Sequence, residues 1–154
     1  MLSSTTFAEP VNGSRDKLTV IGRVHLAAPI TQRISYETAS WYTLVEVPTG
    51  TYDVVLREGR GTSWVHVQYA GTITDEHFVN RVFTASSVAP KRNIGQPRTA
   101  STQGYAYQAA ESFATNPAWE IAEDWSIEST QRSYQDGREY TAYSLHRPDG
   151  SRVF

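Results

Sequence analysis

Residues 125–154 read WSIESTQRSYQDGREYTAYSLHRPDGSRVF, and this stretch contains the two clearest turn signals in the chain. An Asp-Gly pair at 136–137 separates two segments rich in Tyr, Thr, Ile and Leu, which is the short-range pattern of a β-hairpin. A Pro-Asp-Gly turn at 148–150 then directs the last residues back onto the second strand. The sequence therefore predicts a C-terminal meander of three antiparallel strands, 125–134, 138–147 and 151–154.

Alternating apolar and polar residues also run through residues 17–70. Strand formers dominate four stretches, and turn sequences at 48–51 (PTGT) and 58–61 (EGRG) separate the later ones. We therefore expect a four-strand meander with a hairpin at each of these turns. Because an isolated flat sheet exposes its edges, this sheet should curl into a half-barrel or pack under helices. The expected strands are 17–26, 33–47 with its best part at 40–47, 52–58 and 62–70.

Helical patterns are found between the two meanders. The segment 74–76 (TDE) is typical of a helix N-terminus and an apolar stripe follows it, which predicts a short helix over 74–83. Residues 105–114 (YAYQAAESFA) are good helix formers and predict a second helix, with a further helical turn over 117–123. The predicted fold class is α+β, mainly antiparallel β, with a four-strand meander (half-barrel or curled sheet), a C-terminal three-strand meander, and two short helices between them.

A length of 154 residues suits one domain, since two would each be near the size at which burial barely offsets chain entropy. Residues 1–16 are rich in small polar residues without a sustained period, which predicts a mobile N-terminal arm. Residues 17–154 are expected to form a single α+β domain. Within it, residues 84–104 have few large apolar side chains and predict a long loop or arm.

The composition excludes several classes of function. The chain has no Cys, so disulfides, thiolate zinc sites, iron–sulfur clusters and cysteine nucleophiles are absent. A net charge of −2 gives no global attraction to nucleic acid or anionic lipid. There is no signal-peptide pattern and no apolar run long enough for a bilayer, so we expect no membrane partner and a cytoplasmic protein, in the host cytoplasm or virion if virus-encoded. No cofactor is expected.

The four histidines, at positions 25, 66, 77 and 146, give no catalytic or metal signature. None is spaced to bring two ring nitrogens to one ion, and the consecutive residues 75–77 (DEH) would diverge on a helix. Phosphate-binding glycine loops and Gly-x-Ser-x-Gly are also missing. We expect neither catalytic residues nor a metal. One enzymatic alternative is a small His-dependent phosphodiesterase or nuclease, in which His66 works with His25 or His146 and Arg57 or Arg23 stabilises the developing charge.

Trp64, His66 and Gln68 form the best candidate site in the sequence. In the expected strand 62–70 they share one face, while two valines and a tyrosine share the other. If the valine face is the core, Trp64, His66 and Gln68 line a surface or a concave groove for a partner. The alternative is that Trp64 packs beneath a helix and His66 is an ordinary half-buried residue.

Charge is unevenly distributed in the second half of the chain. Between Glu76 and Glu111 there is no acidic residue, and the basic residues there are Arg81, Lys91, Arg92 and Arg98. Between Arg98 and Arg132 there is no basic residue, and the acidic residues there are Glu111, Glu120, Glu123, Asp124 and Glu128. The basic arm either lies over the acidic stretch of the same molecule or a neighbouring copy, or it binds phosphates or an acidic protein surface. We expect Lys91, Arg92 and Arg98 to bind a partner, with Arg92 and Arg98 contacting carboxylates across an interface.

These observations favour a non-catalytic binding protein that acts through protein–protein contacts or self-association, such as an inhibitor, an accessory factor or an assembly subunit of the kind phages and mobile elements encode. The main alternative is a single-stranded nucleic-acid-binding β-domain, although four positive charges are few for phosphates. In that alternative, aromatic residues would stack on unpaired bases, whereas a Cys-free core needs the same residues for packing. The aromatic candidates are Trp41, Tyr42, Trp64, Tyr69, Tyr105 and Tyr107.

Overall fold

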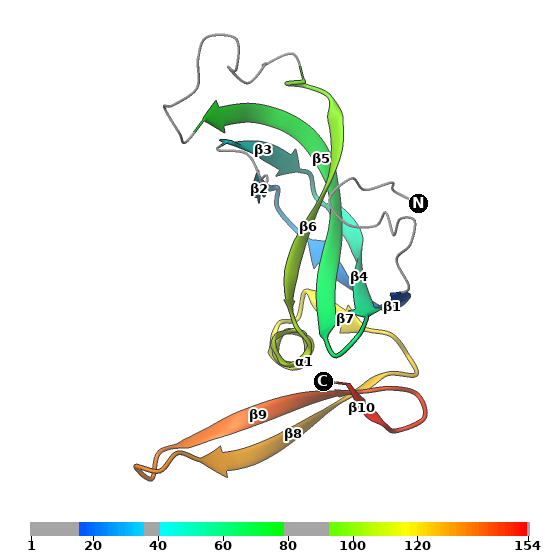
Figure 1. Cartoon of the computed structure of the whole chain (residues 1–154), viewed down its shortest axis with the longest axis vertical. Coiled ribbons are helices and arrows are strands. Elements are labelled where there is room, and N and C mark those ends of the chain that lie inside the picture. Colours follow the sequence, from blue (N-terminus) through cyan, green and yellow to red (C-terminus); the bar gives the residue numbers. More distant parts are fainter. Residues whose placement is uncertain (1–15, 36–40, 79–92, 154) are drawn as a thin grey trace.

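The computed structural model describes residues 16–35, 41–78 and 93–153. This part of the chain contains ten β-strands and one α-helix, arranged as a seven-stranded and a three-stranded sheet (Figure 1). All strand pairs are antiparallel, so the predicted class, α+β with mainly antiparallel β structure, is confirmed. The elements are β1 (Lys17–Leu26), β2 (Ile30–Ser35), β3 (Trp41–Val47), β4 (Gly50–Glu58), β5 (Ser63–Phe78), β6 (Pro97–Tyr105), α1 (Ala106–Thr115), β7 (Trp119–Ile121), β8 (Ser126–Ser133), β9 (Glu139–His146) and β10 (Arg152–Val153).

The seven-stranded sheet is organised around β5, which is 16 residues long. The first part of β5, residues 63–68, pairs with β4, and its last part, residues 72–78, pairs with β3. Consequently β3 and β4 lie end to end along one edge of β5 instead of pairing with each other. In the same way β1 pairs with β4 and β2 pairs with β3, so β1 and β2 also lie end to end.

The hairpin expected at residues 48–51 is therefore wrong, and the strand order differs from that of a simple meander. The Pro-Thr-Gly sequence interrupts the strand without folding it back, because β5 offers both halves a hydrogen-bonding partner. Pro48 has no N–H to donate, which suits a break between two paired segments. The hairpin expected at 58–61 is confirmed: Glu58 lies opposite Ser63, and Gly59 N donates to Thr62 O at 3.0 Å.

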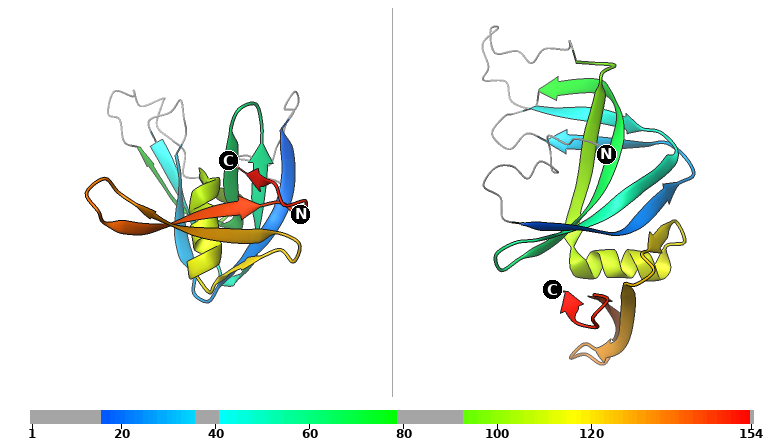
Figure 2. Two further views of the ribbon diagram at one scale, coloured as in Figure 1. Left: turned by 90° about the horizontal axis from the view of Figure 1, so that it is seen from below. Right: turned by 90° about the vertical axis from the view of Figure 1, so that its right-hand side faces the viewer.

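The seven-stranded sheet curls on itself (Figure 2). β6 pairs with the second edge of β5, and β2, from the far end of the sheet, comes into contact with β6. One face of each strand supplies the core, as the two-residue period of a strand requires. Burial of these apolar side chains is the main stabilising contribution to the fold. Core residues of the sheet include Ile21, Val45, Val54, Leu56, Val65, Val67, Ile73 and Ala100.

The helix α1 lies between the curled sheet and the C-terminal sheet (Figure 1). The helix predicted over residues 105–114 is thus confirmed, and its buried residues are Ala106, Ala109 and Ala110. It ends before Pro117, which cannot continue a helix. Phe113 of α1 approaches β1 so closely that a Cβ added to Gly22 would lie 2.5 Å from the Phe113 ring. Glycine at position 22 therefore permits the docking of the helix. Hereafter the body means β1 to β7 together with α1.

Three segments between the meanders differ from expectation. Residues 74–78 continue β5 instead of starting a helix, and residues 79–83 lie outside the described residues. β7 pairs with β1 where a helical turn was expected at 117–123. In the expected loop 84–104, residues 97–104 belong to β6, and 84–92 are outside the described part. In each case backbone pairing with a neighbouring strand outweighs a weak local preference.

The C-terminal three-strand meander is confirmed. β8 pairs with β9 along its whole length, and β10 pairs with the end of β9. Gly137, with φ +93°, provides the left-handed residue in the connecting turn. Trp125, Leu145 and Val153 join the core next to α1, whereas residues 128–141 are exposed on both faces. Hereafter the ribbon means β8, β9 and the turn between them.

Residues 1–15, for which the sequence predicts a mobile arm, lie outside the described residues. The division into an arm and a single domain therefore stays a prediction. In the described part of the chain, no helix has the length and apolar character needed to span a membrane.

Candidate functional site

The structure places Trp64, His66 and Gln68 on β5, flanked by β4 on one edge and β6 on the other. His66 is 2% exposed and Gln68 is 6% exposed. The opposite face of β5 is buried as well, since Val65 and Val67 belong to the core. Only Trp64 of the three is partly exposed. His66 and Gln68 therefore do not offer an open groove.

The environment of His66 favours its neutral form. Burial, and secondly the positive charge of Arg57, lower the pKa of His66 from 6.5 to about 4. The ring is thus uncharged near pH 7. A neutral ring shielded from water is suited to packing rather than to exchanging protons with a substrate at that pH.

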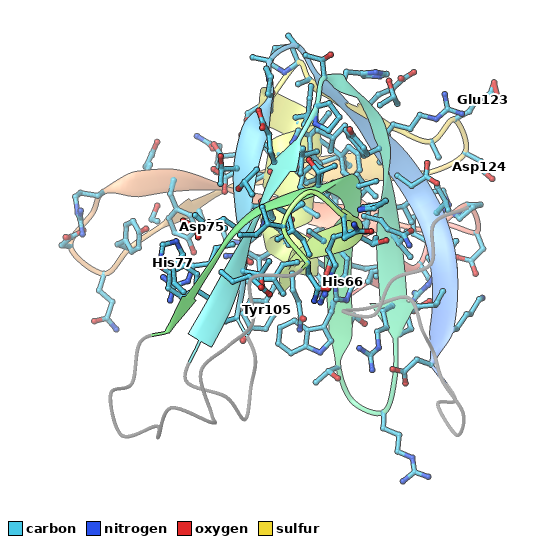
Figure 3. All side chains as sticks on the ribbon, turned by 90° about the horizontal axis from the view of Figure 1, so that it is seen from above. His66, Asp75, His77, Tyr105, Glu123 and Asp124 are labelled. Carbon is cyan, nitrogen blue, oxygen red and sulfur yellow. The ribbon has the colours of Figure 1, made fainter. Side chains whose placement is uncertain are left out.

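Trp64 is the first member of an aromatic stack at the end of the body next to the ribbon. It lies opposite Tyr105 in the register of β5 and β6, and the two rings stack at 4.9 Å. The chain enters α1 directly after Tyr105, so Tyr107 follows in the first helical turn and stacks on Tyr105 at 5.7 Å. Tyr105 N donates to Gln108 Oε1 at 2.8 Å, which fixes this helix start. Tyr105 and His66, both labelled in Figure 3, lie on the paired strands β6 and β5, where Gln103 is the residue opposite His66.

The stack leaves two tyrosines open to a partner. Tyr105 is 50% exposed and Tyr107 is 60% exposed. Both border a groove of about 240 Å³ between the start of α1 and the C-terminal sheet, with Tyr143, Leu145 and Arg152 on the other side. We call Trp64, Tyr105, Tyr107 and Tyr143 the aromatic surface. Its groove is smaller than the roughly 300 to 1,000 Å³ typical of sites for small molecules.

Two of the arginines near the aromatic surface are paired with carboxylates. Arg57, which lies opposite Trp64 in the register of β4 and β5, forms an ion pair with Asp16. Arg147 forms an ion pair with Glu58. Arg57 and Arg147 therefore already have carboxylate partners, with which an anionic ligand would have to compete.

Of the basic residues proposed for partner binding, Lys91 and Arg92 lie outside the described residues. Arg98 lies on β6 opposite Gly71, and its Nε atom is shielded from solvent. It shares a strand face with Ala100, which is in the core. Arg98 therefore projects toward the inside of the sheet rather than from an exposed arm, because residues 97–104 pair with β5.

The strands also bring together a histidine, a hydroxyl and a carboxylate that are far apart in the sequence. His25 Nδ1 lies 3.0 Å from Thr51 Oγ1, and His25 Nε2 lies 2.8 Å from Glu120 Oε1. This order of groups resembles that of a hydrolase triad. The side chains of His25 and Glu120 are, however, 46% and 64% exposed, whereas such triads depend on excluding water. We assign these contacts to holding β7 and β4 against β1.

The other histidines have separate partners. His146 Nε2 lies 3.0 Å from Glu128 Oε1 in the C-terminal sheet, so it shares no partner with His25. His77 Nε2 lies 2.7 Å from Asp75 Oδ2, because alternate residues of a strand share a face (Figure 3). The part of the chain that the structure describes holds no group of three His, Asp or Glu residues able to bind a metal ion.

Comparison with known proteins adds no relative. No protein-family model matches the chain, and neither the curated proteins nor the solved structures contain a significant match.

The sequence named the aromatic residues but did not separate their roles. Tyr69 is in the core, as the packing interpretation favours, while Tyr105 and Tyr107 are exposed. Their spacing in the sequence could have indicated exposure. Tyr105 and Tyr107 are two residues apart across a strand-to-helix junction, so they cannot both lie on the buried helix face that the alanines form.

Proposed function

We propose that this chain is a non-catalytic binding protein, and that it binds an extended segment of a partner protein at the aromatic surface. The observation behind the proposal is the stack of Trp64, Tyr105 and Tyr107, which leaves half or more of each tyrosine exposed beside a groove. Aromatic side chains are enriched at protein interfaces because each buries a large area while only a few of its rotatable bonds have to be immobilised. An inhibitor, an accessory factor or an assembly subunit would all use such a surface.

The size of the groove favours one anchoring side chain. A volume of about 240 Å³ suits a single aromatic or large aliphatic residue, with the rest of the segment lying across the exposed tyrosines. Interfaces concentrate their binding energy in anchors of this kind, which fill a pocket near the centre of the contact. We therefore expect the bound segment to present one large apolar side chain.

The ion pairs of two nearby arginines favour a protein segment over single-stranded nucleic acid. Stacked aromatics suit either partner, but binding to nucleic acid also requires cations that neutralise phosphates. Beside the aromatic surface, Arg57 and Arg147 are already paired with Asp16 and Glu58. A phosphate at Arg57 or Arg147 would have to compete with those carboxylates, and the groove itself contains a single arginine among the described residues, Arg152.

The burial of His66 supports binding over catalysis. The phosphodiesterase alternative depends on His66, which is 2% exposed and has a pKa of about 4. Its suggested partners His25 and His146 are each occupied with a carboxylate on another element.

Panning of a displayed library of random peptides on the immobilised chain tests the proposal. Recovered peptides should contain a large apolar anchor, and the double variant Tyr105→Ser/Tyr107→Ser should weaken their binding by about tenfold or more, as expected for the loss of interface aromatics. The matched control is Tyr134→Ser, which removes a tyrosine of similar exposure, 49%, from the ribbon. Equal losses in the two variants would argue against the aromatic surface as the site.

The same variants separate the alternatives. Oligo(dT) and oligo(rU) should show no binding that depends on Tyr105 and Tyr107. Oligonucleotide binding that weakens steeply with salt and is lost in the double variant would replace the proposal with the nucleic-acid function. Oligonucleotide cleavage that is abolished by His66→Gln would replace it with the enzymatic one.

A further inference from the structure

The strand β8 has one open edge. Its other edge pairs with β9, and in the described residues no strand covers the open one. Every residue of β8 except Ile127 is exposed, and the ribbon projects from the body (Figures 1 and 2). Two-stranded ribbons are only marginally stable alone, and an open edge is a template for pairing with another strand.

Hydrogen bonds at the turn determine which backbone groups face this open edge. Tyr134 N donates to Arg138 O at 2.8 Å, so the backbone of Tyr134 faces β9. Because orientation alternates along an antiparallel strand, the even-numbered residues 128, 130 and 132 also face β9. The odd-numbered residues 127, 129, 131 and 133 therefore direct their N–H and C=O groups out of the open edge.

The sequence of β8 is self-complementary in one register. Two copies that pair antiparallel through their open edges must place odd-numbered residues opposite one another. With Thr130 on the two-fold axis, Ser129 lies opposite Gln131 of the second copy, and Glu128 lies opposite Arg132. Glu128, Thr130 and Arg132 share one face of the strand, so the symmetric contact contains this carboxylate–guanidinium pair twice.

The adjacent registers do not place Glu128 opposite Arg132. Centring the pair on Ser129 places Glu128 opposite Thr130, and centring it on Gln131 places Glu128 opposite Tyr134. In the register centred on Thr130, the side chains of both Glu128 and Arg132 are accessible to the second copy. The Glu128 side chain is 60% exposed, and His146 contacts only its Oε1 atom, while Arg132 is exposed and forms no ion pair within the described residues.

We infer that β8 pairs with β8 of a second copy about a two-fold axis at Thr130, joining two ribbons into one four-stranded antiparallel sheet. This register also places Tyr134 opposite Ser126 of the second copy. The ring of Tyr134 lies 4.5 Å from that of Tyr140, and the guanidinium of Arg138 lies 4.8 Å from the Tyr134 ring. This exposed cluster then packs at the base of the other ribbon. The contact does not involve the aromatic surface, so it does not depend on the proposed function.

Sedimentation velocity of the full chain over a series of concentrations tests the inference. The wild type should dimerise, and Glu128→Arg or Arg132→Glu alone should weaken dimerisation on the order of tenfold, since each places like charges opposite one another. The double variant Glu128→Arg/Arg132→Glu should restore it. An equimolar mixture of the two single variants should form a heterodimer, because every cross-strand pair is then again of opposite sign.

Two further variants test the edge itself. Ser129→Pro removes an N–H from the open edge without removing a bond to β9, so it should prevent dimerisation while circular dichroism stays unchanged. Tyr105→Ser/Tyr107→Ser should leave the dimer intact. A wild type that stays monomeric at every concentration would overturn the inference. So would a dimer that is insensitive to both charge reversals, or single variants whose defect neither the mixture nor the double variant repairs.

Discussion

The body and the ribbon differ in how far their side chains are buried. The body buries Ile21, Val45 and Leu56 completely, and even a histidine is enclosed. Residues 128–141 of the ribbon are exposed on both faces. The ribbon therefore depends on its backbone ladder and its turn, whereas the body depends on packing. We propose that the packed core of the body acts as a scaffold, and that the exposed aromatic surface and the ribbon make the contacts.

The largest expected effect is on the core of the body. Leu56→Ala leaves a cavity where the side chain is 0% exposed, and should lower the free energy of unfolding by about 2–5 kcal/mol. Urea unfolding measures this loss. The matched control is Val20→Ala, at a position that is 52% exposed, which should cost well under about 1 kcal/mol. Similar losses for both variants would contradict a core closed around Leu56.

A second effect follows from His66 and should appear only in acid. The pKa of His66 is about 4 in the folded chain and 6.5 as its ordinary value, so the unfolded chain takes up the proton first as the pH falls. Stability from the neutral ring is fully present above pH 6.5 and is lost progressively between pH 6.5 and about 4. The total loss in the free energy of unfolding is about 3 kcal/mol.

Unfolding of the wild type and of His66→Gln over this pH range isolates the contribution. Because the other histidines titrate in both proteins, the difference between the two curves reports His66. The variant should lose less stability in acid than the wild type. If the free energies of unfolding of the two proteins fell in parallel with pH, His66 would be open to solvent and would not be part of the buried core.

The smallest expected effect is local to the ribbon. Gly137 has φ +93° and no heavy atom within 4 Å of an added Cβ, so Gly137→Ala costs only conformational strain, about 1 kcal/mol. Amide exchange in β8 and β9 should quicken, while urea unfolding of the body should hardly change. A fall in global stability equal to the local one would mean that ribbon and body unfold as one unit.

The sequence could predict the ribbon because its signals are local. An Asp-Gly pair between two strand-forming segments specifies a hairpin whatever the rest of the chain does. The pairing within the body depends instead on β5, which holds β3 and β4 end to end. No local pattern distinguishes a Pro-Thr-Gly bend from a Pro-Thr-Gly turn, so the expected hairpin at 48–51 was wrong.

The candidate site shows the same division. Alternation along residues 64–68 correctly placed Trp64, His66 and Gln68 on one face, but it could not show that this face is buried at His66. The stack of Tyr105 on Trp64 depends on the register between β5 and β6, which pair strands far apart in the chain. Sequence periodicity carries no information about such a register.

Residue-resolved amide hydrogen exchange at low and high protein concentration tests the central claim that a self-sufficient body presents exposed contact elements. We predict that amides of β5 are strongly protected at both concentrations. Ser129 and Gln131, whose amides face the open edge of β8, should exchange quickly in dilute protein and become protected at high concentration, while Thr130 changes much less. Protection of β5 that itself rises with concentration, or edge amides that never become protected, would contradict the account.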